Sequence, residues 1–429
     1  MFVHLEGGWL SHPFPLSSFC LTSEDQLRTL RGLGLRQVNW APEKSLCQDH
    51  AAATGTADAL PTPAPAPADS ADAALQTAAQ IAAQTPARTQ AAASQAAQRE
   101  ALAAQRASTQ VCERQYAEAA QAWRGASQSL TRHPEDCRRS TEALAGALLN
   151  KMLATDEVAV RLINGSGTDR AAAHALNVSV ISMLMGRALG LADDDMLDMG
   201  VGALLHDIGK QDMPERLRHA EEGFGSTELN AYRDHVAKGV AQGQRMALSA
   251  GALAVLAQHH EHADGSGFPA GLSSERLSTA ARIVAIVNRY DNLCNPSARM
   301  PALTPHEAVS TLFAQSRSRF DAAVLGAFIR MMGVYPAGSL VQLTDDRYAQ
   351  VVGVNSSRPL KPRVLVHDPR TPRSEALLLN LDQVPDLGIR RSLAAAKLPA
   401  AALQYLDPRP RVAYTFEALA APEEARKSA

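Results

Sequence analysis

Seven of the 13 histidines in this chain fall between residues 174 and 262. Two of them, His259 and His260, are adjacent in the stretch LAQHHEHADGSGFP, which breaks into a glycine-rich turn. Imidazole nitrogens bind transition-metal ions, and a nearby carboxylate completes a common ligand set. A single histidine on a helix is more often a hydrogen-bonded core or surface residue than a ligand. The density of this cluster therefore favours a metal site over packing alone.

A second element with this chemistry is GALLHDIGK, residues 202–210. An apolar helix is expected to end at His206 and Asp207, and Gly209 then turns the chain. A carboxylate can bridge two ions whereas an imidazole serves one. Lys210 adds a point charge suited to a phosphate oxygen. The alternative interpretation is a buried helix end at which the histidine and the aspartate only cap the helix.

Two further histidines are expected on helices around these elements. His235 occurs in YRDHVAKG, and His174 occurs in AAAHALNVSV, which has apolar residues at helical spacing. Gly265 and Gly267 follow the histidine pair, and without side chains they allow the backbone to approach a ligand closely. These elements together predict a site built by several helices.

The rest of the chain is organised around a helical region. Its 429 residues suggest two or three domains. Residues 1–47 alternate short strand patterns with one helical pattern, TSEDQLRTLRGLG, and predict a small α+β module. Residues 135–335 carry repeated helical periods and predict an all-α bundle as the catalytic core. Residues 336–429 show period-two runs, which predict a small β-rich extension and a frayed tail.

Residues 48–131 connect the first module to the helical region. Up to Pro86 this segment is rich in alanine, proline and threonine, which predicts a disordered, partly extended linker. Residues 87–131 are rich in alanine, glutamine and arginine and contain no proline. This composition is compatible with two interpretations, a solvated helix or a continuation of the linker. An exposed helix in this segment could support a homodimer.

Composition narrows the function classes. The net charge is −2 and the charged share is 20%, which argues against a nucleic-acid polymer as the main partner. No run of about eighteen apolar residues predicts a membrane span. The cysteines are scattered without a CxxC pair, as is typical of a reducing cytoplasm, and we expect a cytoplasmic location. The five cysteines are Cys20, Cys47, Cys112, Cys137 and Cys294.

The order of these motifs resembles the HD-GYP family, a branch of the HD-domain metal phosphohydrolases. The resemblance covers about residues 165–335 and includes ARIVAIVNRYDNL (281–293) and TPHEAV (304–309) after the glycine turn. The N-terminal unit is similar to the small domain often found ahead of HD-GYP domains. The resemblance implies two or three bound metal ions, usually iron or manganese, and hydrolysis of cyclic di-GMP to the linear dinucleotide or GMP.

The resemblance also implies roles for particular residues. Asp207 would bridge two divalent ions and, with Lys210, carry the catalysis. His174 and His206 would serve one metal, and His235, His259 and His260 would serve the other. Glu261 would orient a ligand rather than bind a metal. Substrate contacts would come from Lys210, Asp264, Gly267, Arg282, Asp291 and Arg299.

Four positions depart from the family pattern. Asn288 stands where the family has a metal-binding aspartate, and its neutral amide is a weaker ligand that Asp291 could partly replace. Arg170 replaces a glutamate that holds a third metal. The family's basic phosphate-binding segment reads CNPSARMPA, with Arg299 as its one base. Phe268 replaces a tyrosine and keeps a stacking surface without the hydroxyl.

Three hypotheses follow from these observations. The first is an active, metal-dependent cyclic di-GMP phosphodiesterase. The second is a degenerate HD-GYP domain that binds nucleotide or protein partners as a signalling module. The third is an HD phosphohydrolase for another phosphorylated substrate. Partners implied by the resemblance are a cyclic dinucleotide and a diguanylate cyclase or other signalling protein, together with possible dimerisation.

Overall fold

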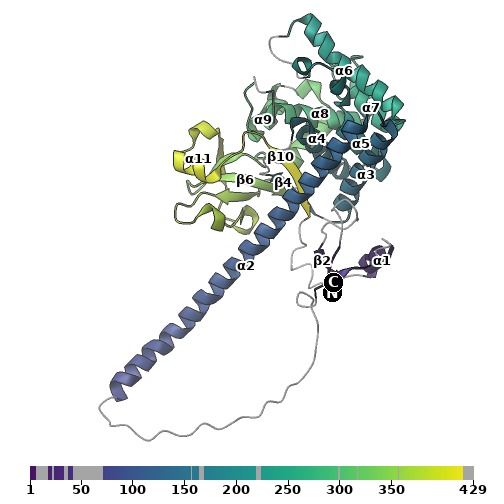
Figure 1. Cartoon of the computed structure of the whole chain (residues 1–429). Coiled ribbons are helices and arrows are strands. Elements are labelled where there is room, and N and C mark those ends of the chain that lie inside the picture. The colour runs from purple at the N-terminus through teal and green to yellow at the C-terminus, as the bar shows by residue number, and fades with distance from the viewer. Residues whose placement is uncertain are drawn as a thin grey trace. The chain divides into compact units, whose positions relative to one another are not determined.

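The structure is a computed structural model of the chain (Figure 1). It divides into two compact units, one of residues 1–6 and 18–108 and one of residues 7–17 and 109–429, and each is described here by itself. The residues that the structure describes are 1–5, 18–21, 24–32, 37–41, 71–155, 157–163, 169–218, 224–297, 300–315, 317–355 and 357–418.

The first unit begins with a small antiparallel sheet and one helix. Strand β1 (Phe2–His4) lies between β2 (Ser18–Cys20) and β3 (Asn39–Trp40), and helix α1 (Glu24–Gly32) follows β2 in the chain. The α+β character expected for this segment is confirmed.

Helix α2 (Ala71–Ser129) runs from the first unit into the second. It begins inside the segment that was expected to be an extended linker and it includes Pro86, because its many alanines and glutamines favour helix. The expectation of a solvated segment is also wrong for its last turns. One face of α2 between Cys112 and Ala126 is buried in the core of the second unit, and the Trp123 indole N–H donates to the carbonyl oxygen of Leu204.

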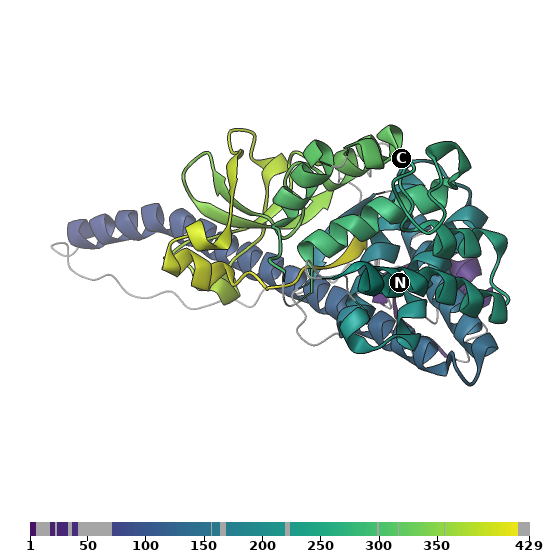
Figure 2. The same cartoon turned by 90° about the horizontal axis from the view of Figure 1, so that it is seen from above.

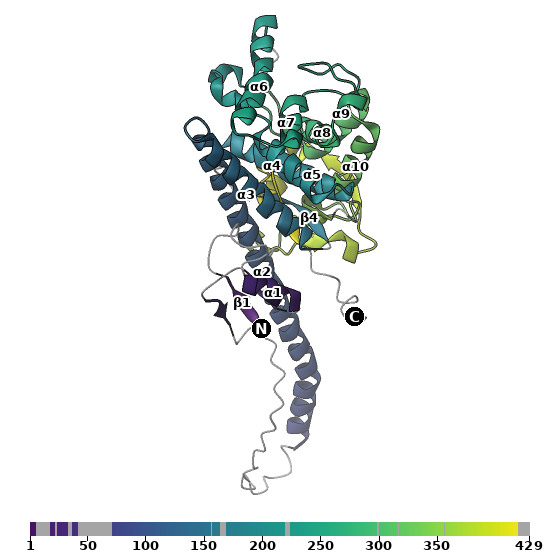
Figure 3. The ribbon, with the colours of Figure 1, turned by 90° about the vertical axis from the view of Figure 1, so that its right-hand side faces the viewer.

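Helices form the core of the second unit, as the sequence predicts. Figures 2 and 3 show α4 and α5 packed among their neighbours, with the sheet beside this helical layer. No helix in the described ranges is both long enough and apolar enough to cross a membrane. The helices are α3 (Pro134–Leu153), α4 (Arg170–Ala188), α5 (Asp193–Leu205), α6 (Ser226–Arg245), α7 (Ala250–Gln258), α8 (Thr279–Cys294), α9 (Pro305–Gln315) and α10 (Ala322–Met332).

Short polar side chains begin several of these helices. Asp169, Ser249 and Ser278 each accept a hydrogen bond from the backbone N–H three residues later, at the starts of α4, α7 and α8. Such caps satisfy donors that the first turn of a helix leaves free. Three aspartates, residues 193–195, occupy the first turn of α5, where the helix dipole favours negative charge.

An antiparallel sheet completes the second unit, in the order β10-β4-β6-β5-β9, with β7 paired to β6 and β8 paired to β7. The β-rich character expected for residues 336–429 is confirmed, and β5 (Leu340–Leu343) pairs with β6 (Tyr348–Asn355) as a hairpin. The other strands are β4 (Val158–Ile163), β7 (Arg363–Val366), β8 (Leu379–Asn380), β9 (Ile389–Leu393) and β10 (Ala413–Ala418), and helix α11 spans Ala400–Leu406.

The sheet is not separate from the bundle, in contrast to the boundary drawn at residue 335. Strand β4 precedes α4 in the chain but pairs with both β10 and β6. Tyr414 of β10 is fully buried, and its hydroxyl lies 2.9 Å from that of Tyr290 on α8. The expected all-α domain of residues 135–335 therefore contains one strand of the C-terminal sheet and shares its core with that sheet.

Candidate metal centre

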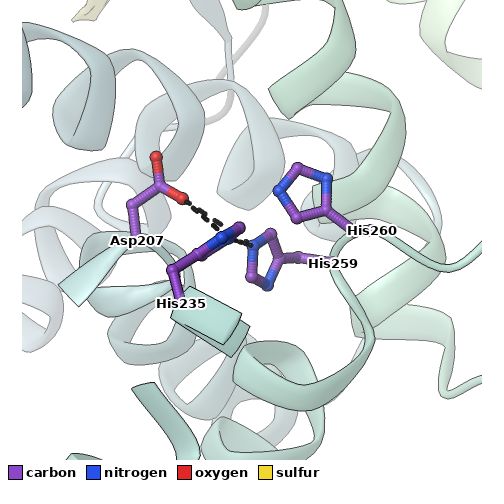
Figure 4. A group of neighbouring side chains, drawn as sticks. All are labelled: Asp207, His235, His259 and His260. Carbon is purple, nitrogen blue, oxygen red and sulfur yellow. Dashed lines mark hydrogen bonds and ion pairs between the residues drawn. The ribbon is translucent and has the colours of Figure 1, made fainter. Parts of the chain in front are cut away.

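Four helices bring the predicted histidines and Asp207 to one place. Figure 4 shows Asp207 with His235, His259 and His260. His174 lies in α4 and His235 in α6, whereas the other ligand candidates follow directly after the ends of α5 and α7. Gly209 allows the short 3-10 helix η4 (Ile208–Asp212) to pack on α6, because a Cβ there would overlap the carbonyl oxygen of His235. This packing holds Asp207 against the helix that carries His235.

The two carboxylate oxygens of Asp207 face two different groups of imidazoles. Oδ2 lies 3.6 Å from Nε2 of His174 and 3.5 Å from Nε2 of His206. Oδ1 lies 3.5 Å from Nε2 of His235 and 3.8 Å from Nε2 of His259. Candidate ligand atoms of His260 also fall within 4.8 Å of those of the second group. The arrangement matches a carboxylate that bridges two cation sites.

Hydrogen bonds behind the imidazoles define which nitrogen of each carries the proton. Nδ1 of His206, His235 and His259 lies 2.6–2.9 Å from a backbone carbonyl oxygen, that of Ala203, Tyr232 and Leu256 respectively. A carbonyl oxygen can only accept, so each Nδ1 donates its hydrogen. Each Nε2 is therefore left with a lone pair directed toward Asp207, as a metal ligand requires.

The residues present fit a bound cation. The Nε2 atoms of His174 and His206 are 3.1 Å apart, and those of His235 and His259 are 3.3 Å apart. Two lone pairs at such a distance repel each other unless a positive charge lies close to both. Asp207 Oδ1 is buried and has no hydrogen-bond partner among the described residues. A buried carboxylate oxygen without a donor is costly, and a metal ion would satisfy it.

Burial keeps the imidazoles neutral. It lowers the pKa of His206 to about 4 and holds the pKa of His259 and His260 well below the usual range. Burial alone would raise the pKa of Asp207, but Lys210 at 2.7 Å and the surrounding imidazoles hold it well below its ordinary value. Near neutral pH the site thus combines neutral nitrogen donors with a charged carboxylate, which are the protonation states that metal binding requires.

The metal-free protein should lose stability in mild acid. Between pH 6.5 and about 4 the unfolded chain protonates His206 whereas the folded chain does not, so the free energy of unfolding falls as the pH falls. Urea unfolding in EDTA at pH 7 and pH 5 checks this, with a lower midpoint expected at pH 5. His206→Gln should weaken the pH dependence. Equal midpoints at the two pH values would contradict the neutral state of the cluster.

Asp291 lies behind the cluster rather than in contact with the substrate, which corrects the expectation from the sequence. It is fully buried, and its Oδ2 accepts a hydrogen bond from His174 Nδ1 at 2.6 Å. Its Oδ1 accepts from the side-chain amides of Asn177 and Asn295, at 2.7 and 2.9 Å. Both carboxylate oxygens are therefore occupied, and Asp291 orients His174 instead of replacing a ligand at Asn288.

The glycine turn after His260 is organised by its own acidic residues. Glu261 is buried, and its carboxylate accepts hydrogen bonds from the backbone N–H groups of residues 270–272. A Cβ on Gly267 would overlap the backbone of Glu261 and His262, so this position requires glycine. Asp264 is exposed and accepts from the N–H and hydroxyl of Ser266. Gly267 and Asp264 thus shape the turn, and the substrate contacts expected of them stay a prediction.

A cavity of about 330 Å³ opens beside the cluster. Lys210, His259, His260 and Asn288 line it, together with Phe268, whose ring stacks on His260 at 4.5 Å between centroids. Tyr232, Arg289 and Arg319 are among the lining residues that were not predicted from the sequence. Tyr232 precedes His235 by one helical turn, a signal that the sequence offered, whereas nothing local marks the two arginines.

One basic residue expected at the substrate, Arg282, is not among the described residues that line this cavity. Arg282 donates to Asp321 Oδ2 at 3.0 Å and to the carbonyl oxygen of Leu277, so it joins the start of α8 to the N-cap of α10. Arg299 lies outside the described residues. Asn288 lines the cavity, and its Oδ1 accepts a hydrogen bond from the amide of Asn292 at 2.6 Å.

Comparisons with known proteins agree with this site. Residues 149–324 match the HD domain family, and residues 1–136 match a domain of unknown function, DUF3391. The chain is 30% identical over 379 residues to cyclic di-GMP phosphodiesterase PA4108 of Pseudomonas aeruginosa, covering 85% of this chain and 82% of that relative. It is 25% identical over 191 residues to cyclic di-GMP phosphodiesterase PdeB of Borreliella burgdorferi, covering 44% of this chain and half of that relative.

Among solved structures, Bd1817, a HDG"Y"P protein from Bdellovibrio bacteriovorus, aligns with 51% of this chain and 71% of its own, at a TM-score of 0.41 and 18% identity. The sequence identity to the Pseudomonas protein extends over most of both chains, and the HD domain match contains every histidine of the Asp207 cluster. The chain therefore belongs to the HD-GYP branch of the HD-domain family.

Proposed function

We propose that this protein is a metal-dependent phosphodiesterase that hydrolyses cyclic di-GMP to linear pGpG or GMP in bacterial second-messenger signalling. The observation that carries the proposal is the Asp207 carboxylate, whose two oxygens each face a separate pair of imidazoles beside a cavity with positive walls. The relatives named cyclic di-GMP phosphodiesterases support the choice of substrate.

HD domains bind divalent metal ions, and the residues here suit two of them. We assign His174, His206 and Asp207 to one ion and Asp207, His235, His259 and His260 to the other. Iron and manganese are our candidates, since both accept imidazole and carboxylate ligands. Paired ions supply a water of lowered pKa and stabilise charge on phosphoryl oxygens.

The chain's own residues hold the substrate and the ligands in place. The Lys210 ammonium lies 2.7 Å from Asp207 Oδ2 and 5.2 Å from the centre of the Tyr232 ring, at the edge of the cavity. From there it can donate to a phosphate oxygen next to the metal cluster. Phe268, stacked on His260, offers an apolar surface for a base.

The central experiment measures metal content and turnover on one preparation. The protein is purified under conditions that keep iron reduced, metal is measured per chain, and cyclic di-GMP hydrolysis is assayed. Two ions per chain with turnover supports the proposal. Full metal loading without turnover of cyclic di-GMP points to another phosphorylated substrate. Loss of the metal during purification leaves the degenerate signalling module as the better hypothesis.

Asn288→Asp should strengthen metal retention and raise kcat/KM, by about tenfold, the scale of ligand-sphere effects. The aspartate can still accept from Asn292 and adds a negative charge to the wall of the cavity. Metal per chain after dialysis and initial rates check the prediction. Asn230→Asp on the exposed face of α6 adds the same charge outside the cavity and should change neither quantity. Unchanged metal retention in Asn288→Asp would show that the amide of Asn288 does not weaken metal binding.

The degenerate module is the second candidate, favoured by the amide at Asn288 and by CNPSARMPA in place of a basic segment. In that case the protein would bind a nucleotide or a signalling partner such as a diguanylate cyclase without turnover. A homodimer through α2 and a cytoplasmic location stay predictions for either candidate.

A further inference from the structure

The cavity beside Asp207 has positive side chains that the proposed function has not yet used. Among the described residues that line it, Arg170, Lys210, Arg289 and Arg319 are positive and none is acidic. The charge of Lys210 is paired with Asp207. A cavity with this balance of charge is suited to an anion with more than one negative group.

Arg170 donates to the carbonyl oxygen of Asn295, whereas Arg289 and Arg319 make no ion pair with an acidic side chain of the described residues. They come from different elements, α8 and the short 3-10 helix η7 (Arg317–Arg319), and both are exposed to the cavity. Burial and the neighbouring charge of Arg319 lower the pKa of Arg289, as expected for two like charges that face each other. Guanidinium groups form paired hydrogen bonds with phosphate, which would relieve this repulsion.

A buried hydroxyl in the same wall also lacks a partner. Ser297 is 8% exposed and lines the cavity, and its Oγ has no hydrogen-bond partner among the described residues. Buried hydroxyl groups are normally hydrogen-bonded, so this atom is an unsatisfied polar group behind the cavity wall. It stands in CNPSARMPA, the segment whose basic residues the family uses for phosphate.

Tyr232 connects the arginines to the metal cluster. Its hydroxyl lies 3.5 Å from Nε2 of His260, and its ring lies under the Lys210 ammonium. The charge of Arg289 also acts on Tyr232. One ligand can therefore contact the Asp207 cluster and the arginines together, provided that it carries two separated anionic groups.

We propose that Arg289 and Arg319 bind the second phosphate of the cyclic dinucleotide, the one that is not being hydrolysed. This inference rests on the proposed function. Each phosphodiester of a cyclic dinucleotide carries one negative charge, and the Asp207 cluster takes only the scissile group. The arginine pair supplies, from α8 and η7, the positive charge that CNPSARMPA lacks, and it selects diesters with two phosphates over simple ones.

The test compares two substrates in arginine variants of the full chain. We expect Arg289→Gln and Arg319→Gln each to lower kcat/KM for cyclic di-GMP by about tenfold, the scale of one charged hydrogen bond. The loss on bis(p-nitrophenyl) phosphate, a diester with one phosphate, should be several times smaller. Lysine at either position should restore part of the rate. Arg276→Gln removes an exposed arginine outside the cavity and should leave both rates unchanged.

Metal content and cyclic di-GMP dissociation constants are measured for every variant, so that loss of the cluster is separated from loss of the subsite. Equal losses on the two substrates, or no loss on cyclic di-GMP, would overturn the inference. If the wild type binds cyclic di-GMP without cleaving it, the proposed function fails and the subsite is tested by the dissociation constants alone. A tenfold weaker binding of cyclic di-GMP in the arginine variants would then support the subsite. A wild type that neither binds nor cleaves cyclic di-GMP overturns both.

Discussion

Asp207→Asn is expected to abolish metal retention at both sites and to lower kcat by about 100-fold or more. The asparagine has the same shape but no charge, so it cannot bridge two cations between the imidazole pairs that face Oδ1 and Oδ2. It also releases Lys210 from its 2.7 Å ion pair. Metal analysis after gel filtration, followed by turnover of cyclic di-GMP with metal added back, measures both effects.

A matched control is Asp234→Asn, which removes an exposed carboxylate from α6 next to His235. It should keep full metal content and activity. If Asp207→Asn also kept two ions per chain with less than a tenfold loss of kcat, the bridging role of Asp207 would be wrong. The histidine cluster would then be a structural feature of the helix ends, the interpretation that the sequence left open.

Asp291→Asn is expected to weaken metal affinity by about 10–100-fold, the range seen when a residue behind a metal ligand is replaced. The Asp291 carboxylate accepts the Nδ1 hydrogen of His174 at 2.6 Å and thereby keeps its Nε2 free for the metal. A neutral amide makes the imidazole less basic and places one N–H group opposite other donors, those of Asn177 and Asn295. The measurement is the metal concentration that gives half-maximal activity.

High metal concentration should restore most of the kcat of Asp291→Asn, which distinguishes orientation of a ligand from a direct role in the reaction. Thermal unfolding in EDTA gives the separate effect on stability, since the buried network of Asp291 also supports the core. An unchanged metal-activation curve would show that His174 binds the metal without help from Asp291. A loss of kcat that saturating metal does not restore would indicate that Asp291 contacts the substrate, as the sequence analysis expected.

Local sequence predicted much of the fold correctly because caps and turns act over a few residues. Asp169, Ser249 and Ser278 begin helices through hydrogen bonds that span only three positions. The hairpin of β5 and β6 likewise follows from alternation around a short turn. The extended linker expected up to Pro86 is helical from Ala71, and the composition did not reveal that the end of α2 packs into the core.

The sequence by itself determined the chemistry of the centre, because the order of its motifs supplied the five histidines around Asp207 and the lysine beside it. Only the tertiary structure decided which side chains contact one another at the site. His174 and Asp291 are 117 positions apart, Arg282 pairs with Asp321 on another helix, and Arg289 and Arg319 meet at one cavity from two elements. Side-chain contacts of this kind depend on how the helices pack, and no spacing along the chain encodes that packing directly.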